Sequence, residues 1–269
     1  MRGALAAASL MWALAIAPAA AAREPGMFCL DRTELAAERK NASGPAQKYL
    51  FSETGSMGSM IAGYERTLAA AERGDKDAQR KIGGFWAACV LAGDGMGAQK
   101  LTTAAAYLDA AAKRGDNQAM RYMALFYALG SGVPADYAEA YRQLAASGYP
   151  QDAVAQTAAQ LQLTQASPAE QQAIVVFGEA LRSLLQARLP SIADEIVRDE
   201  AKGRPLSVRT IVTTCPNQAR IQQASDGIDR DALQAQLQAL MQLLPSAGLP
   251  CKSDDGQPAG MAIPFTIKR

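Results

Sequence analysis

The chain has 269 residues and a formal net charge of +1, because 27 basic side chains nearly balance 26 acidic ones. This balance leaves no strong field to attract nucleic acid or an anionic membrane surface, so neither is an expected partner. The sequence contains no histidine. That absence excludes Ser-His-Asp and Cys-His catalysis and removes the most common zinc ligand. The length fits one large domain or two modest ones, and we expect two.

The N-terminal residues have the composition of a secretory leader. A single charge at Arg2 precedes an uncharged, alanine-rich run, and small residues follow Pro18 as far as Arg23. This is the order of a signal peptide and its cleavage site. We therefore expect residues 1–22 to be a signal peptide that is removed on export. The alternative is an uncleaved membrane anchor, since the run is almost long enough to span a bilayer.

An even number of cysteines in an exported chain predicts disulfides in preference to a metal site. The four are Cys29, Cys89, Cys215 and Cys251, and none belongs to a C-x-x-C pair. Cys29 lies in an N-terminal segment, residues 23–58, beyond the apolar run, so we do not expect a lipid-modified cysteine. The sequence predicts neither a metal nor a cofactor.

Residues 59–165 are helical in texture and repeat a motif. "LAAAERGDKDAQRKIGGFW" from Leu68 aligns with "LDAAAKRGDNQAMRYMALFY" from Leu108, and "YRQLAASGYPQDAV" from Tyr141 is a weaker third copy. A second marker recurs between the copies, as "GDGM" at Gly93 and "GSGV" at Gly130. Such a period is typical of helix-turn-helix units, which bury their apolar faces by stacking on one another.

This motif resembles the Sel-one-like repeat family, a relative of the tetratricopeptide repeats. The second copy carries the family's residues in order: Gly115, Ala119, Met123, Tyr127, Gly130, Gly132 and Val133. The resemblance implies a short α-helical solenoid. In the first copy the glycines lie further apart, so its first helix is predicted to be one turn longer, with Cys89 in the added turn.

Aromatic side chains gather in these repeat helices. Their spacing is that of core positions, and the alternative is that a few lie on the concave side as peptide contacts. They are Phe85, Trp86, Tyr122, Phe126 and Tyr127.

Residues 166–204 are predicted to be connecting helices. Ser167, Pro168 and Glu170 make a capping box with proline at the first helical position, which begins a helix that runs to about Leu189.

A shorter second helix is predicted from Ser191 to about Gly203, where Pro205 prevents it from continuing. We place the domain boundary between Gln165 and Pro205.

Residues 205–269 change from a helical to an alternating pattern. "LSVRTIVTTC" and "QARIQQAS" predict a β-hairpin, and "MAIPFTIK" predicts a last strand. Between them, "DRDALQAQLQALMQLLP" predicts an amphipathic helix. Its leucine stripe is Leu233, Leu237, Leu240 and Leu244. A small ββαβ unit after the helical repeats gives an α+β fold for the chain.

The order of features in this unit resembles the TonB family C-terminal domain. The matching residues, in chain order, are Ser225, Gly227, Ile228 to Leu233, Pro250, Asp255 to Pro258 and Ile263 to Ile267. The resemblance implies a periplasmic protein of a Gram-negative bacterium and a strand that pairs with a partner's strand. Ile263, Phe265 and Ile267 share one face of the last strand, where they can bury against the leucine stripe. They are also the candidate partner-binding residues.

The sequence departs from that family at the hairpin turn, Cys215 to Asn217, and lacks the family's aromatic residue before Pro250. Cys215 lies near the turn and Cys251 in the loop after the helix. A disulfide between them is therefore predicted in place of the missing packing, which leaves Cys29 to pair with Cys89. Crossed pairing and free thiols remain alternatives.

Two contact modules without a catalytic constellation favour a non-catalytic periplasmic adaptor for protein-protein interaction. One alternative is a TonB-like energy transducer, although its Pro-rich span is not recognisable here. Another is that the two modules pack together as one structural body. A hydrolase is the least favoured, because the acidic residues read as a solvated helix face and a turn. They are Asp194, Glu195, Asp199, Glu200, Asp254 and Asp255, the last two also being candidate calcium ligands.

Overall fold

The computed structural model describes residues 27–44, 51, 56–150, 152–198, 203–215 and 217–267. The predicted signal peptide lies outside these residues. The helices are η1 (Met27–Cys29), α1 (Arg32–Asn41), α3 (Ser56–Glu72), α4 (Lys76–Ala92), α5 (Ala98–Ala112), α6 (Asn117–Leu129), α7 (Tyr137–Ala146), α8 (Asp152–Gln160), α9 (Pro168–Ile196) and α10 (Arg230–Met241). The strands are β1 (Leu206–Thr214), β2 (Asn217–Ala224) and β3 (Gly260–Ile267). In this part of the chain the fold is α+β and mostly helical, with one antiparallel sheet.

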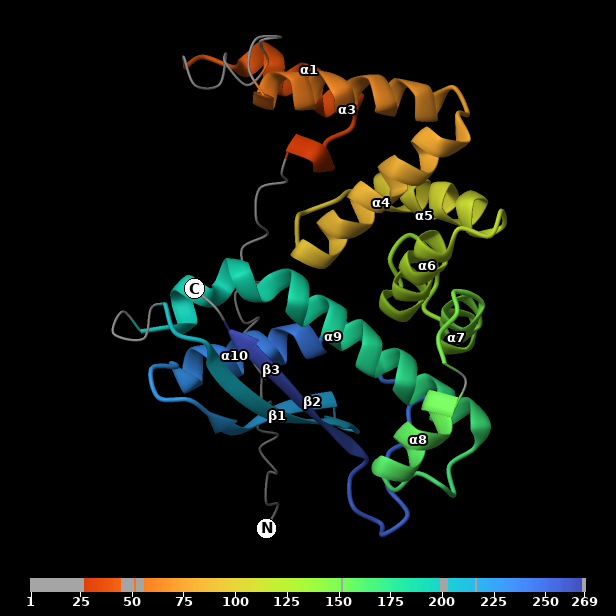
Figure 1. The fold of residues 1–269 in the computed structure, drawn as a ribbon, viewed down its shortest axis with the longest axis vertical. Coiled ribbons are helices and arrows are strands. Elements are labelled where there is room, and N and C mark those ends of the chain that lie inside the picture. The colour runs from red at the N-terminus through yellow and green to blue at the C-terminus, as the bar shows by residue number, and fades with distance from the viewer. Residues whose placement is uncertain are drawn as a thin grey trace, which may run out of the picture.

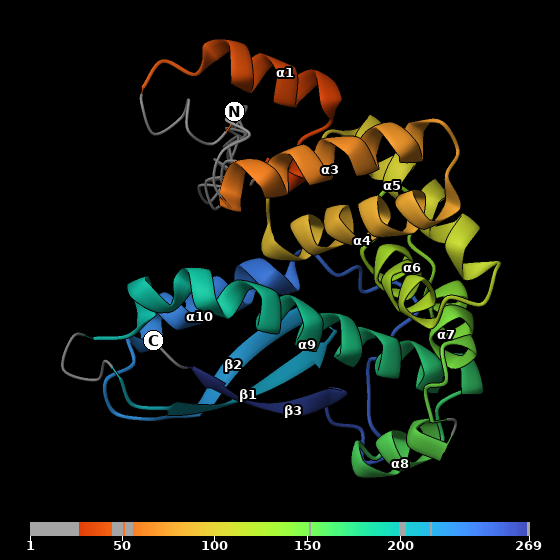
Figure 2. The same ribbon diagram turned by 45° about the horizontal axis from the view of Figure 1, so that its top comes forward.

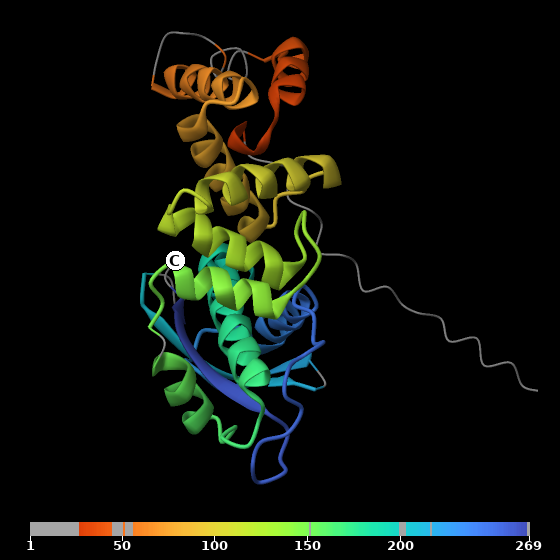
Figure 3. The ribbon, with the colours of Figure 1, turned by 90° about the vertical axis from the view of Figure 1, so that its right-hand side faces the viewer.

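Helices α3 to α7 each pack against the next helix along the chain, and Figure 3 shows them stacked down the long axis of the molecule. Asp75, Asp116 and Asp136 begin α4, α6 and α7 by accepting a hydrogen bond from an amide of the first turn. Helix α4 has 17 residues and α6 has 13, so the extra turn predicted for the first copy is confirmed. Cys89 lies in that turn.

The second glycine of the "GSGV" marker is required by a close approach between two segments. Gly132 has φ +70°, and a Cβ built on it would lie 2.3 Å from the carbonyl oxygen of Leu101. The loop after α6 therefore passes directly over the first turn of α5, at a distance that only glycine permits.

Helix α9 differs from the prediction of two helices separated at Leu189. The capping box of Ser167 and Glu170 is confirmed, but a single helix continues through Pro190 to Ile196. Proline costs one backbone hydrogen bond inside a helix. The helix continues because it is buried on both sides of Pro190, by Leu189 before it and by Ala193 and Ile196 after it.

Buried apolar residues of α9 join the helical stack to the sheet. One hydrophobic cluster runs from α6 and α7 through α9 into α10 and all three strands. A second cluster holds the N-terminal segment together with α3 to α6. Helix α9 contacts α4, α6 and α7 on one side and α10 and β3 on the other. The predicted connecting region thus contributes the core that the helical stack and the sheet share.

The sheet has the strand order β2-β1-β3, and Figure 2 shows α9 and α10 on the same face of it. The predicted order of strand, strand, helix and strand is confirmed (Figure 1). Asp229 caps α10 as its position suggests, accepting from the amides of Asp231 and Ala232. All four residues of the leucine stripe are buried. None of the described helices is both long enough and apolar enough to cross a membrane.

We predict that Gly132→Ala is more destabilising than Gly115→Ala. Both glycines have positive φ, but a Cβ at Gly115 would meet nothing within 4 Å. Gly115→Ala should therefore cost only the left-handed backbone penalty of about 1 to 2 kcal/mol. Gly132→Ala should cost about 2 kcal/mol more, because it also forces two backbone segments apart. Urea unfolding measures both, and equal losses would contradict this contact.

Candidate functional site at the edges of the sheet

The outer edge of β2 is covered by two glutamine side chains of α10. Gln238 accepts from the amide of Ala219 (3.4 Å) and donates to the carbonyl of Asn217 (3.2 Å). Gln234 accepts from the amide of Ile221 (3.2 Å) and donates to the carbonyl of Ala219. Side-chain amides carry the same donor and acceptor as a peptide group, so they occupy the positions of a further strand. This edge is therefore closed to another chain.

The pairing of β1 with β3 shows which residues of β3 face outward. The amide of Thr214 donates to the carbonyl of Ala259 (3.1 Å), so Thr214 faces the β3 side. In an antiparallel strand the N–H and C=O groups of successive residues point alternately to the two neighbouring strands. The register aligns Val212 with Met261 and Thr210 with Ile263. The backbones of Met261, Ile263, Phe265 and Ile267 therefore point to β1, whereas those of Ala262, Pro264 and Thr266 point away from the sheet.

The outer edge of β3 has no cover comparable to that of β2. No described residue hydrogen-bonds the outward amides of Ala262 and Thr266 or the outward carbonyls of Ala262, Pro264 and Thr266. Pro264 lies at an outward position, so its missing N–H costs no bond to β1. Unpaired backbone groups on an edge strand are a template for pairing with another chain.

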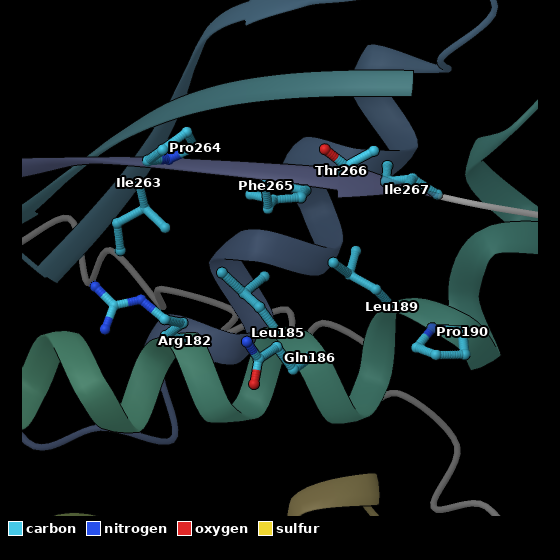
Figure 4. A pocket seen from close by; sticks show the side chains of 10 residues that line it. All are labelled: Arg182, Leu185, Gln186, Leu189, Pro190, Ile263, Pro264, Phe265, Thr266 and Ile267. Atoms are coloured by element: carbon cyan, nitrogen blue, oxygen red, sulfur yellow. The ribbon is translucent and has the colours of Figure 1, made fainter. Parts of the chain in front are cut away.

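A groove of ≈ 380 Å³ runs along β3 between this strand and α9. Figure 4 shows Phe265, Leu185 and Leu189 pointing into the space between them, whereas Pro264 and Thr266 point away from α9. Arg182 lies at the end near Ile263, where it forms an ion pair with Glu179. The lining residues are Arg182, Leu185, Gln186, Leu189, Pro190 and Ile263 to Ile267. The bare edge thus borders a groove that is apolar along most of its length.

The structure brings the three candidate partner-binding residues to this groove but gives them different roles. Ile263 is 3% exposed and Ile267 1%, so their side chains belong mainly to the core. Phe265 is half-buried and lines the groove. Sequence analysis missed the residues whose backbones face outward, Ala262, Pro264 and Thr266. Pro264 could have predicted them from the sequence, because a proline within a strand favours a position whose backbone faces away from the neighbouring strand.

The predicted disulfides Cys215–Cys251 and Cys29–Cys89 are both present. The first joins the hairpin turn to the loop after α10, where the hydroxyl of Thr214 also donates to the carbonyl of Pro250. It fixes the end of the sheet that carries the β1–β2 turn to the loop after α10.

The second disulfide joins the N-terminal segment to α4. Beside it, Trp86 donates to the hydroxyl of Tyr64 (2.9 Å), which donates to the carbonyl of Leu30 (2.8 Å). Burial raises the pKa of Tyr64, so the phenol stays protonated and keeps this bond at any physiological pH.

The aromatic residues of the repeat helices divide between core and surface. Trp86 and Phe126 are buried, as their spacing predicts. Phe85 is 44% exposed and, with Tyr122, lines a second groove of ≈ 420 Å³ between α4 and α6. Arg80 and Asp116, an ion pair at 3.3 Å, also line it.

The carboxylates considered for catalysis or calcium binding are engaged in capping. Asp254 accepts from the amides of Thr164 and Gln165 (3.0 Å each), which holds the loop before β3 against the end of the helical stack. The hydroxyl of Thr164, which also donates to Asp254, and these two amides lower the pKa of Asp254. Asp255 accepts from Ser253 and from the amide of Gln257, as in a turn.

Of the helical carboxylates, Glu195 is exposed and accepts from Gln236 (3.0 Å). Asp199, Glu200 and the side chain of Asp194 lie outside the described residues. None of these contacts gathers carboxylates into a reactive centre within the described chain.

No protein-family model matches this chain, and neither a curated protein nor a solved structure matches it.

We predict that removing both glutamine caps, Gln234→Ala with Gln238→Ala, opens the second edge. The loss of four hydrogen bonds should lower the free energy of unfolding by about 2 to 4 kcal/mol. The freed β2 edge can then pair with the β3 edge of another copy, a head-to-tail contact that does not close on itself. Sedimentation velocity should show concentration-dependent association of the double variant.

The matched control is Gln242→Ala, at the exposed C-cap of the same helix. A double variant that stays as monodisperse and as stable as this control would contradict the capping role.

Proposed function

We propose that this protein is an exported, non-catalytic adaptor of the bacterial periplasm, and that an extended segment of a partner protein binds it as a fourth strand beside β3. The observation that carries the proposal is the asymmetry of the sheet edges. Gln234 and Gln238 close the β2 edge, whereas the outward groups of β3 have no partner among the described residues.

The backbone of β3 supplies the affinity in this mode of binding. The amides of Ala262 and Thr266 donate to the partner strand, and the carbonyls of Ala262, Pro264 and Thr266 accept from it. A missing donor at Pro264 breaks the regular pattern in the middle of the strand. The partner strand therefore makes fewer bonds to β3 than β1 does.

The groove supplies selectivity. Side chains alternate between the two faces of a strand, so every second residue of an added strand points toward α9. These residues would meet Phe265 and Leu189, which favours apolar side chains in the partner at alternate positions. Main-chain pairing with pockets for alternate side chains is the usual form of strand addition.

The helical stack has a separate role in the proposal. Its motif resembles Sel-one-like repeats, whose inner surface commonly holds a partner. Here α9 packs against α4, α6 and α7, so that part of the stack is occupied by the chain itself. The stack therefore acts first as a support for the sheet, and its second groove at Phe85 is left for another contact.

Two sequence features and two bonds of the structure support the location and the absence of catalysis. The N-terminal residues read as a signal peptide, the two disulfides suit an oxidising compartment, and no histidine is present. The resemblance of the last unit to the TonB C-terminal domain points to the same compartment.

We predict that Thr266→Pro weakens partner binding, whereas Pro264→Thr does not. Thr266→Pro removes an outward donor without touching the bonds to β1, and Pro264 shows that this strand accepts proline at an outward position. The loss should be about five- to ten-fold in Kd. Pro264→Thr adds an outward donor and should leave binding unchanged or tighter.

The probes for this test are peptides selected on the immobilised full chain from a random-peptide phage library, with Kd measured by fluorescence anisotropy. Urea unfolding confirms that each variant remains folded. Peptides that bind Thr266→Pro and wild-type protein equally, and are lost instead on Phe85→Ala, would place the binding surface on the helical stack and overturn the proposal.

A further inference from the structure

Asp94 places an unpaired carboxylate beside the disulfide of the N-terminal segment. Its Oδ2 atom lies 3.1 Å from Sγ of Cys29. A disulfide sulfur carries no proton, so this contact gives the carboxylate no hydrogen bond. The Oδ1 atom is out of contact with solvent and has no hydrogen-bond partner. Burying a carboxylate oxygen without a hydrogen bond costs free energy, and no described residue offers Oδ1 one in the disulfide form.

The local backbone holds Asp94 in this position. Gly93 ends α4 with φ +87°, and the amide of Asp94 then donates to the carbonyl of Cys89 (3.0 Å). This C-terminal turn fixes Asp94 directly over the last turn of α4, which carries Cys89. The carboxylate is thus positioned by the helix end and not by a partner of its own.

Two positive side chains, Lys100 and Arg188, contact the backbone next to the cluster. Lys100 is 6% exposed at its side chain, and its Nζ donates to the carbonyl of Cys29 (3.1 Å) and pairs with Glu34. The guanidinium carbon of Arg188 lies 3.0 Å from where a Cβ on Gly93 would be, and Nε of Arg188 donates to the carbonyl of Leu91. Two cationic side chains thus lie at the end of α4 where the proposed ligands gather.

We propose that, when the Cys29–Cys89 bond is reduced, the two thiolates and the carboxylate of Asp94 bind one Zn²⁺ ion. Their ligand atoms all lie within 4.8 Å of one another, and thiolate and carboxylate are both zinc ligands. Three protein ligands leave the fourth tetrahedral position to water. The Cα atoms of the two cysteines are 5.8 Å apart, so the thiolates can separate around an ion by side-chain rotation alone.

The two states of the site interconvert by balanced steps. A dithiol reductant transfers two electrons and two protons to the disulfide, giving two thiols and its own cyclic disulfide. Zinc binding then releases the two thiol protons. Oxidation of the thiolates by a disulfide oxidant returns two electrons to that oxidant and expels the ion. In both states the N-terminal segment remains attached to α4, by a covalent bond or by the metal.

The second disulfide provides an internal comparison. Among the described residues, one group of potential ligands lies close enough to share an ion, and it consists of Cys29, Cys89 and Asp94. The pair Cys215–Cys251 has no such third ligand nearby in this part of the chain. The proposal concerns a different part of the chain from β3 and does not rest on the adaptor function.

The test uses Co²⁺ as a spectroscopic substitute for Zn²⁺. Full-length protein is reduced with a phosphine, freed of reductant without oxygen and titrated with Co²⁺. We expect one ion per chain, with thiolate-to-cobalt charge-transfer absorption, displaced by Zn²⁺. The absorption should persist in the double variant Cys215→Ser with Cys251→Ser and vanish in Cys29→Ser with Cys89→Ser.

Asp94→Asn tests the carboxylate while keeping the size of the side chain. It should weaken Co²⁺ binding by at least the roughly ten-fold that loss of an outer-sphere partner costs. Near-ultraviolet circular dichroism checks that each variant is folded. If the Cys215→Ser with Cys251→Ser variant does not fold, reduced wild-type protein replaces it in the titration. Absence of charge-transfer absorption in folded, reduced protein, or equal affinity in Asp94→Asn, would overturn the proposal.

Discussion

Backbone hydrogen bonding at the two edges of a three-stranded sheet is the constraint on which this protein depends. A sheet of this size leaves two rows of peptide groups that need water, side chains or another strand. On β2 the chain supplies its own partners, Gln234 and Gln238, in the geometry of a further strand. On β3 it supplies a proline and a groove instead. One sheet therefore has an edge capped by the chain's own side chains and an edge whose outward groups have no partner among the described residues.

Helix α9 links the two halves of that arrangement. Its buried residues pack against both the helical stack and the sheet, so its apolar side chains lie beside β3. The groove lies between this helix and β3 and is lined by side chains of both. Asp254 adds a second link, from the loop before β3 to Thr164 and Gln165 at the end of the stack.

Sequence patterns were sufficient for local structure and for pairings between elements close in the chain. The capping box at Ser167 and the longer α4 follow from residue type at short range, and both are present. The disulfide Cys215–Cys251, which is also present, is inferred from the order of elements in the last unit and its departures from the TonB family. The break expected at Pro190 is absent, because burial of Leu189 and Ile196 outweighs one lost hydrogen bond. Local propensity gives no measure of that burial.

The proposed binding surface depends on contacts that no local sequence pattern records. The glutamines of α10 read as the polar face of an amphipathic helix, and only the placement of α10 beside β2 turns them into edge caps. Alternation predicts that Ile263 and Ile267 bury against the helix, and both are in the core. Their choice as partner-binding candidates comes from the resemblance to the TonB C-terminal domain, which does not separate core side chains from outward backbone groups. The unpaired carboxylate of Asp94 likewise depends on the fold that brings Cys29 to α4.

Amide hydrogen exchange resolved to single residues, measured by NMR on the wild-type chain, tests the asymmetry of the edges most directly. The capped amides of Ala219 and Ile221 should exchange slowly, with protection that reports local opening of α10, while those of Ala262 and Thr266 should exchange nearly as fast as in an unstructured peptide. Equal protection of the two edges, or slow exchange at Ala262 and Thr266 in the isolated protein, would contradict an open β3 edge.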